Sequence, residues 1–345
     1  MPQKRRIAVI GLGMAVTPHA RSLVDLGDRV EVAHAFSRSA ERRRAFAERF
    51  DFPLADDLEL IVSDASVSAV MILTPPATHQ ELALRFAAAG KHILLEKPLE
   101  RSTERAEALV QAAEAAGVRL GVVFQSRFRE ASLALKRRLE QGALGELAAA
   151  NVVCPWWRPQ SYYDEPGRGT LARDGGGVLI TQAIHTLDLA LSLTGPVAEV
   201  AALAGTTRLH RMETEDFAGA GLRFANGALG SLFATTAEYP GFPERIELIG
   251  TRATAVLAAG VVTIHHHDGR HETIGEEQST GGGADPMAFP HDAHRALLTE
   301  FLDALDQDRQ PKPSGREALE VHRLIDAVLR SSEVGRAIAI PAGEL

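Results

Sequence analysis

Short apolar segments alternate with helical patterns over the first third of the chain. Ile7–Ile10 is a continuous apolar run, as is typical of a strand buried on both faces of a sheet. Further strands of this kind are predicted at residues 30–36, 68–73, 93–95 and 118–124. Helical segments lie between them. This β-α-β alternation predicts a parallel, doubly wound sheet that binds ligands at the carboxyl ends of its strands.

The pattern changes near residue 125. Helices are predicted at about 128–140 and 180–193, with a strand at 147–154 between them. Short strand-like segments separated by turn signals then dominate; they lie at 197–204, 217–224, 228–236, 245–250, 253–257 and 261–265. This pattern indicates an antiparallel sheet with one solvated or helix-covered face. A glycine-rich stretch at 276–290 is expected to be a loop, and two amphipathic helices follow at 293–306 and 316–331.

A chain of 345 residues suggests roughly two domains. We expect a dinucleotide-binding Rossmann domain at 1–124 and an α/β domain for substrate binding and oligomerisation at 125–345. The fold class is therefore α/β, with a parallel Rossmann sheet and an open, mainly antiparallel second sheet.

Charge and composition narrow the range of partners. The net charge is −8 without a basic stripe, so no nucleic-acid partner is expected. No apolar run approaches the roughly 20 residues of a membrane span, so no membrane partner is expected. The lone Cys154 excludes an internal disulfide, and a buried structural thiol is favoured over a nucleophile. The first strand begins near Ile7, so no signal peptide is expected, and we predict a cytoplasmic protein.

A glycine turn follows the first strand. Gly11 and Gly13 lie between that strand and a helix, which is the context of the dinucleotide-binding fingerprint. Glycines there let the backbone approach a pyrophosphate at the helix N-terminus. The third fingerprint position is Val16 rather than glycine or alanine, so a plain strand-turn-helix connection is the alternative.

The end of the second strand bears on the choice of cofactor. An acidic residue there would bind the ribose 2′-hydroxyl of NAD, but this chain has Ser37 and Arg38. A guanidinium suits a 2′-phosphate, and Arg42 and Arg43 lie about one turn further on. We therefore favour NADP over NAD; the alternative is that Arg38 is simply solvated.

The end of the 68–73 strand carries further candidate residues. Thr74-Pro75-Pro76 forms a rigid loop that could support the nicotinamide or its ribose, or a simple turn. His79 follows within a capping-box pattern that spans Thr78 and Glu81; it could touch the cofactor or make a partly buried contact at the helix start.

A lysine follows the 92–95 strand within Glu96-Lys97-Pro98. A cis proline bond at this position would orient Lys97. A partly desolvated lysine beside a cationic nicotinamide would have a pKa lowered toward neutrality, which suits proton transfer. A surface Glu-Lys-Pro turn is the alternative.

These motifs together carry a family resemblance. GLGMA at 11–15, LTPPATH at 73–79, LLEKPL at 94–99 and GGGVLITQAIHTLD at 175–188 resemble the Gfo/Idh/MocA family of NAD(P)-dependent oxidoreductases. The resemblance implies a Rossmann domain followed by a domain whose open sheet commonly forms an oligomer interface, so a homodimer or homotetramer is expected. It also implies that the final helix, about 316–331, returns to the Rossmann domain.

The resemblance implies that Lys97 and His185 take the proton from a sugar hydroxyl as hydride leaves its carbon. Many relatives have aspartate four residues before this histidine, and here Thr181 occupies that position. Thr181 and Gln182 can hydrogen-bond a hydroxyl, but neither is a base at neutral pH. Either His185 carries more of the proton transfer, or it orients substrate while Lys97 acts alone. Asp188 could orient the His185 ring, or the two could be a satisfied buried pair.

The expected contacts follow from these assignments. The loop before the glycine-histidine helix carries aromatic residues and arginines that suit a polyol or a sugar acid, although core aromatics with solvated arginines are an equal alternative. The residues expected to contact the cofactor are Gly11, Leu12, Gly13, Met14, Ala15, Ser37, Arg38, Arg42, Thr74, Pro75, Pro76, His79, Glu96, Lys97 and Gln125. Those expected to contact substrate are Lys97, Trp157, Arg158, Tyr163, Thr181, Gln182 and His185.

Four histidines lie together in His265–His267 and His271. Consecutive strand residues point to alternate faces, so these side chains do not readily converge on one ion, and no metal site is expected.

The leading hypothesis is an NADP- or NAD-dependent dehydrogenase or reductase of a sugar, sugar acid or cyclitol. One alternative is a redox-assisted glycosidase that keeps its nicotinamide bound. Another is a non-catalytic sugar or nucleotide sensor, although the presence of both Lys97 and His185 argues against it.

Overall fold

The computed structural model describes residues 4–277 and 290–341. The chain divides into two compact units. One comprises Met1–Gln125 with Pro290–Leu319, and the other comprises Ser126–Phe289 with Glu320–Leu345. The expected loop at 276–290 lies largely outside the described residues.

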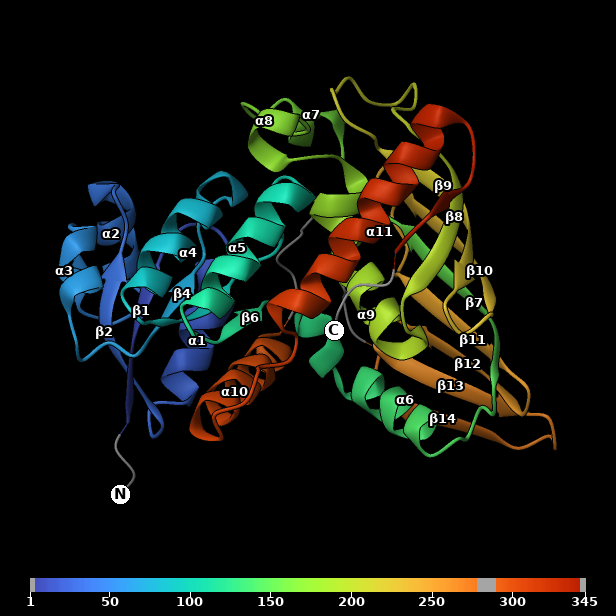
Figure 1. Ribbon diagram of the computed structural model, residues 1–345, viewed down its shortest axis with the longest axis horizontal. Coiled ribbons are helices and arrows are strands. Elements are labelled where there is room, and N and C mark those ends of the chain that lie inside the picture. Colours follow the sequence, from blue (N-terminus) through green and yellow to red (C-terminus); the bar gives the residue numbers. More distant parts are fainter. Residues whose placement is uncertain (1–3, 278–289, 342–345) are drawn as a thin grey trace. The chain divides into compact units, whose positions relative to one another are not determined.

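The first unit is built on a parallel sheet of six strands in the order β3-β2-β1-β4-β5-β6. Figure 1 labels β1, β2, β4 and β6 of this sheet. Its strands are β1 Arg5–Ile10, β2 Val30–Phe36, β3 Leu54–Ala55, β4 Ala69–Ile72, β5 His92–Leu95 and β6 Leu120–Val122. Its helices are α1 Val16–Asp25, α2 Ala40–Ala47, α3 Leu58–Ser63, α4 His79–Ala88 and α5 Thr103–Ala115. Every residue of β4 is buried, because helices cover both faces of a doubly wound sheet. The predicted fold class is confirmed, whereas the two-residue β3 and the short helix α3 were not expected.

A segment from the end of the chain completes this unit. Helix α10, Asp292–Asp306, packs beside α1, and Asp25 of α1 accepts hydrogen bonds from His291 and Arg295, each at 2.9 Å. The sequence-based division, which assigned all of 125–345 to the second domain, is therefore wrong for 290–319. The returning element is α10 together with the first residues of α11, Gly315–Val334, rather than the final helix alone.

The second unit contains a nine-stranded sheet in the order β14-β13-β12-β11-β7-β10-β9-β8-β15. Its strands are β7 Leu147–Pro155, β8 Val197–Gly205, β9 Phe217–Phe224, β10 Leu229–Thr235, β11 Arg245–Gly250, β12 Ala253–Ala258, β13 Val261–His266, β14 His271–Gly275 and β15 Ile338–Ala339. All pairs are antiparallel except β7 with β10, which is parallel. The expected antiparallel sheet is thus confirmed as mainly antiparallel, and β14 and β15 were missed.

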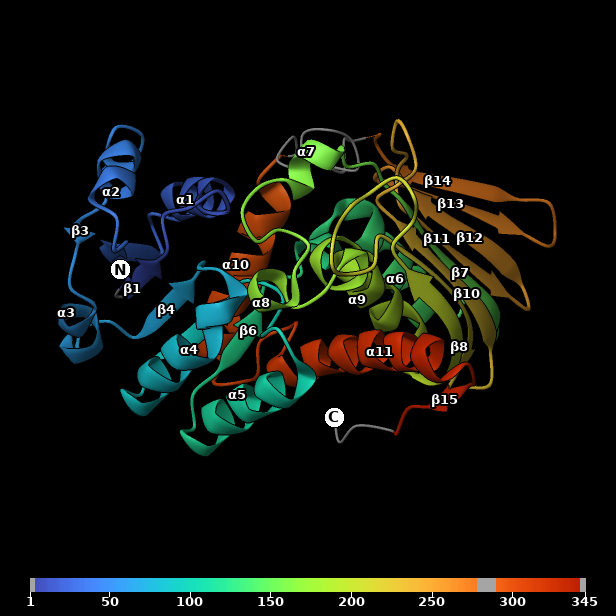
Figure 2. The ribbon, with the colours of Figure 1, turned by 90° about the horizontal axis from the view of Figure 1, so that it is seen from above.

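Helices cover one face of this sheet (Figure 2). They are α6 Glu130–Glu140 and α9 Ile184–Thr194, and short helices α7 Gln160–Tyr163 and α8 Leu171–Asp174 lie in the connection before α9. Alternate residues of β12 are buried, which is the period expected of a strand with one covered face. Residues Leu171–Thr194 are long and apolar enough by composition to span a membrane, contrary to the expectation from the sequence, but 72% of the apolar stretch is buried, as is usual for a core helix.

Candidate active site

The glycine turn has the geometry that a dinucleotide requires. Gly11 has a φ of +106°, and a Cβ there would lie 2.8 Å from the carbonyl carbon of Leu73, so only glycine fits. Leu12 is buried and can offer only its backbone to a ligand, whereas Met14 is exposed. Helix α1 begins at Val16, directly after the turn and its N-cap residue Ala15. The turn therefore leaves room for a close approach to backbone at the N-terminus of α1.

The basic residues after β2 divide into two kinds. Arg43 donates to the carbonyl oxygen of Ser37 at 2.5 Å and lies 3.7 Å from Asp56, so it supports the loop. Arg38 and Arg42 are exposed, and no described residue forms an ion pair with either. A Cβ on Gly13 would lie 3.9 Å from Nη1 of Arg42, which places this guanidinium beside the glycine turn.

His79 joins the loops that follow β4 and β5. Its ring is fully buried, with Nε2 2.8 Å from the carbonyl oxygen of Thr74 and Nδ1 2.9 Å from that of Pro98. Burial lowers the pKa of His79, and the contacts with backbone carbonyl oxygens oppose this shift. Both ring nitrogens face backbone, so this side chain presents no polar atom to a cofactor.

The capping box expected at Thr78 and Glu81 does not form. The Thr78 hydroxyl donates instead to Oγ1 of Thr74 at 2.8 Å and to the carbonyl oxygen of Pro75 at 2.9 Å. It thereby braces the loop that contains Pro75, which is exposed, and Pro76, which is half-buried.

Lys97 lies just after the buried strand β5 and is half-buried. Its peptide bond to Pro98 is cis. The Lys97 backbone N–H donates to Oε2 of Glu96 at 3.0 Å, and Oε1 of Glu96 lies 2.9 Å from Nε2 of His19. Gln125, also half-buried, follows β6 at the start of a 3₁₀ turn, Gln125–Phe128. The first unit thus gathers the expected cofactor-binding residues at the carboxyl ends of its strands.

In the second unit, a π-helical turn carries two expected substrate residues. Leu179–Ala183 forms this turn, and α9 continues from it at Ile184. Such turns occur often at functional sites, and the periodicity of the sequence gave no sign of it. Thr181 donates to the carbonyl oxygen of Gly177 at 2.6 Å and also contacts Oε1 of Gln182. Thr181 and His185 are both partly exposed, whereas the residues around them are buried.

The residue expected to orient His185 has a different main partner. Asp188 is fully buried, and its two carboxylate oxygens accept hydrogen bonds from Nε and Nη2 of Arg127, each at 2.7 Å. A bidentate guanidinium pair offsets much of the cost of burying a carboxylate. Arg127 lies far away in sequence, and no motif pointed to it.

The loop before the π-helical turn is only partly a binding surface. Arg158 is buried, its guanidinium stacks 5.3 Å from the Trp156 ring, and burial lowers its pKa. Tyr163 is also buried, with its hydroxyl 2.6 Å from Oγ1 of Thr236, and burial raises its pKa. Trp157 is half-buried and packs edge-on against Tyr239 at 5.5 Å. Arg158 and Tyr163 therefore contribute to the core of this unit.

Tyr162 was not among the expected substrate contacts, yet its hydroxyl lies beside Gln182, which was. Its hydroxyl accepts a hydrogen bond from Nη1 of Arg168 at 2.7 Å and lies 3.4 Å from Nε2 of Gln182. The Arg168 guanidinium also lies 4.2 Å from the Tyr162 ring centre and pairs with Glu165 at 2.7 Å. The adjacent Tyr162 and Tyr163 were equivalent in the sequence pattern, and only the different partners of their hydroxyls, Gln182 and Thr236, distinguish them.

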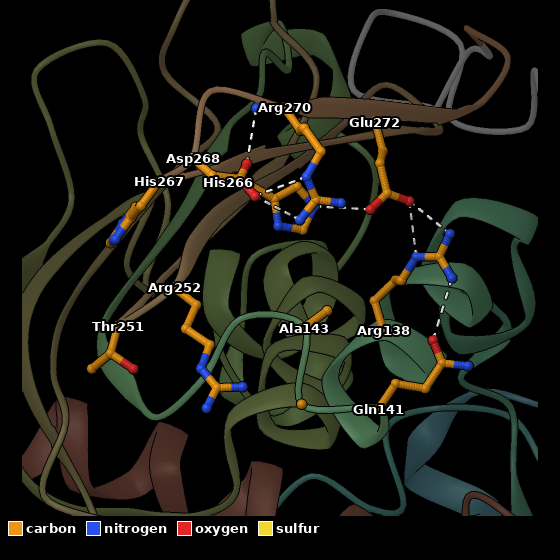
Figure 3. A pocket seen from close by; sticks show the side chains of 11 residues that line it. Arg138, Gln141, Ala143, Thr251, Arg252, His266, His267, Asp268, Arg270 and Glu272 are labelled. Atoms are coloured by element: carbon orange, nitrogen blue, oxygen red, sulfur yellow. Dashed lines mark hydrogen bonds and ion pairs between the residues drawn. The ribbon is translucent and has the colours of Figure 1, made fainter.

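The histidine-rich strand lines a separate cavity of about 650 Å³ (Figure 3). Glu272 accepts hydrogen bonds there from His266 at 2.9 Å and from Arg138 at 2.6 Å, which ties α6 to the β13–β14 hairpin. Among the described residues no group of three His, Cys, Asp or Glu side chains is placed to hold a metal ion. Cys154 is buried, and burial raises the pKa of its thiol, consistent with a structural role.

Comparison with known proteins covers both units. Residues 5–124 match the family model of an oxidoreductase family with an NAD-binding Rossmann fold, and residues 132–256 match the GFO/IDH/MocA C-terminal domain. The chain is 28% identical over 321 residues to 1,5-anhydro-D-fructose reductase of Ensifer adhaerens, covering 91% of this chain and 92% of the relative. It is 29% identical over 347 residues to myo-inositol 2-dehydrogenase of Thermotoga maritima, covering 97% and 98%.

A solved structure with the same fold is the WlbA dehydrogenase of Bordetella pertussis in complex with NADH and UDP-GlcNAcA. It is 29% identical, with a TM-score of 0.84, and the match covers 99% of each chain.

Proposed function

Because the chain belongs to the Gfo/Idh/MocA family of oxidoreductases, we propose that it transfers hydride between nicotinamide C4 and a hydroxyl-bearing carbon of a sugar, sugar acid or cyclitol. Relatives that match nearly the whole chain are named for such reactions, one as a reductase and one as a dehydrogenase. The observation that carries the proposal is that one unit contains both the glycine turn at Gly11 and the half-buried Lys97, each at the carboxyl end of a strand of the same sheet.

The residues at the first unit's strand ends fit a nicotinamide dinucleotide. A Cβ at Gly11 would fill the place that the turn keeps open, and the N-terminus of α1 favours a pyrophosphate charge. Arg38 and Arg42, which no described residue neutralises, suit a 2′-phosphate. We therefore favour NADP, with NAD as the alternative that the NADH-bound relative supports.

We assign proton transfer to Lys97 and His185. When bound, the nicotinamide would accept or supply the hydride, and the protein must move only a proton. Lys97 Nζ is proposed to take the proton of the reacting hydroxyl in oxidation and to return it in reduction. His185, whose ordinary pKa lies near neutrality, is proposed to share this task. Thr181 is proposed to hydrogen-bond the substrate, at the position where the family resemblance implies an aspartate in many members.

The polar groups of the second unit favour a neutral polyol. The hydroxyls of Thr181 and Tyr162 and the amide of Gln182 offer donors and acceptors that match adjacent sugar hydroxyls. The charge of Arg168 is balanced by Glu165, and Arg158 is buried against aromatic rings. We therefore place cyclitols and neutral sugars ahead of sugar acids as substrates.

The test is nicotinamide absorbance with NADP⁺ and NAD⁺ against inositols, neutral aldoses and sugar acids. Turnover with a neutral polyol is expected, and Lys97→Met should lower kcat at least about 100-fold while NADP⁺ binding, measured by calorimetry, persists. Adding His185→Asn to Lys97→Met should then cost little more, because residues that act on one proton are not additive.

Two results would count against these proposals. Normal turnover by Lys97→Met would overturn the role assigned to Lys97 but not the hydride transfer itself. Cleavage of a glycosidic bond by enzyme that retains its nicotinamide without net turnover would overturn the proposed function and establish a redox-assisted glycosidase.

A further inference from the structure

Three ionisable side chains that the proposed reaction does not use lie together in the first unit. His19 comes from α1, Glu96 from the loop after β5, and His294 from α10. The two histidines are 1% and 4% exposed, and their rings meet edge to face at 5.0 Å. Burying an ionisable group costs free energy unless it is paired, so these side chains are expected to stabilise one another.

Glu96 connects this cluster to Lys97. One carboxylate oxygen lies 2.9 Å from Nε2 of His19, and the other accepts the Lys97 backbone N–H at 3.0 Å. On the other side of Lys97, the Pro98 carbonyl oxygen lies 2.9 Å from Nδ1 of His79. The residues that flank Lys97 are thus each held by a histidine from a helix.

The charge on Glu96 depends on this arrangement. Burial by itself raises the pKa of Glu96, but the hydrogen bond and charge of His19, with the charges of Lys97 and His294, outweigh burial and lower it. The ionisable groups around this carboxylate are therefore His19 from α1, His79 from α4, Lys97 from its own loop and His294 from α10. The Glu96 side chain is only 13% exposed, so without the donor from His19 its carboxylate would be poorly compensated.

We propose that His19 is a positioning residue for Lys97: it holds the Glu96 carboxylate, which in turn fixes the Lys97 backbone and keeps a negative charge beside the Lys97 ammonium. This inference rests on the proposed role of Lys97. It predicts that the protonation and placement of Lys97 depend on a side chain that lies inside the Rossmann unit.

The test compares His19→Leu with His19→Gln. Gln Nε2 can donate to the same carboxylate oxygen, whereas leucine cannot. We expect His19→Leu to lower kcat at least about tenfold near neutral pH and to move the acidic limb of the kcat–pH profile upward, because Glu96 would protonate more readily. Substrate KM and NADP⁺ affinity should change less than about threefold, and His19→Gln should restore kcat to within about threefold.

A second histidine–carboxylate pair supplies the matched control. His34 lies 2.9 Å from Asp64 in the same unit, and Asp64 also accepts from Ser66. His34→Leu should affect thermal stability without moving the pH profile of kcat. If His19→Leu fails to fold, Glu96→Gln replaces it, with the same drop in kcat expected and the acidic limb removed.

The outcomes separate the two proposals. A wild-type kcat and pH profile in His19→Leu, or in Glu96→Gln if that variant is needed, overturns the positioning role while leaving Lys97 in place. Full activity of Lys97→Met overturns the catalytic assignment itself.

Discussion

Gly177 passes so close to Glu215 that a Cβ on the glycine would lie 1.8 Å from the Glu215 carbonyl oxygen. The Glu215 carboxylate accepts the backbone N–H groups of Gly177 at 3.0 Å and Leu179 at 3.1 Å, and its carbonyl oxygen accepts that of Val178 at 2.8 Å. One residue therefore satisfies three N–H groups at the start of the helical segment that carries Thr181 and His185. A carboxylate at this helix end also complements the helix dipole.

Gly177→Ala should destabilise the protein by about 3 kcal/mol, because the added methyl group meets backbone that cannot move aside. Thermal denaturation measures this change. Gly221→Ala is the matched control, since a Cβ there has open space and should leave the melting temperature nearly unchanged. Equal stability of the two variants would show that the segment starting at Gly177 adapts freely.

Glu215→Gln should change how stability depends on pH. Burial raises the pKa of Glu215 above its ordinary 4.5, although the N–H groups of Leu179 and Gly177 partly offset it. The folded protein then binds this proton more tightly than the unfolded chain. Its stabilising contribution is full below about pH 4.5 and is lost as the pH rises through the folded value.

The melting temperature of wild type minus that of Glu215→Gln should therefore shrink as the pH rises from about 4 to about 8. Any fixed cost of placing an amide against backbone N–H groups adds a constant offset to this difference. A difference that stays constant over the whole range would show that Glu215 does not titrate there.

Arg38→Ala and Arg42→Ala should each shift cofactor preference toward NAD⁺. Loss of a charge-assisted contact with a 2′-phosphate should lower kcat/KM for NADP⁺ by about 10- to 100-fold and leave that for NAD⁺ nearly unchanged. Arg44→Ala, an exposed arginine further along α2, serves as the control. If the NADP⁺ to NAD⁺ ratio stays the same in both variants, the preference for NADP is wrong.

Tyr162→Phe and Tyr163→Phe form a matched pair with opposite expected effects. Tyr162→Phe removes the hydroxyl beside Gln182 and should lower kcat/KM for substrate about 3- to 10-fold with little change in stability. Tyr163→Phe breaks the buried contact with Thr236 and should cost about 1 kcal/mol of stability while kcat/KM stays near wild type. Steady-state kinetics and thermal denaturation of both variants would reveal a reversal of these roles.

The sequence pattern predicted the structure well where adjacent residues alone determine it. The β1 strand and the turn at Gly11 were predicted because apolar continuity and glycine placement are properties of adjacent residues. The strand boundaries of β9 and β11 were predicted without error for the same reason. The cysteine was correctly expected to be buried, since a lone thiol in a strand usually packs as a small apolar group.

The directions of side chains and the contacts between residues far apart in the sequence were harder to predict. Tyr162 and Tyr163 are neighbours, and a single helical step turns one toward Gln182 and the other toward Thr236. The π-helical turn at Leu179–Ala183 depends on one backbone hydrogen-bond shift that leaves no periodic trace. His79 was a candidate for cofactor contact until the fold placed both its ring nitrogens on backbone carbonyl oxygens.

The sequence by itself determined the class of fold, the dinucleotide turn and the family, because these depend on residue types at short, fixed spacings. Only the tertiary structure decided that 290–319 joins the first unit, that Asp188 binds Arg127, and that His19 holds Glu96. The sequence shows that an amphipathic helix, or a charged residue among apolar ones, requires a partner. It does not show which partner, because many segments would satisfy the same pattern. The choice among them is made by packing between segments far apart along the chain, which no local spacing records.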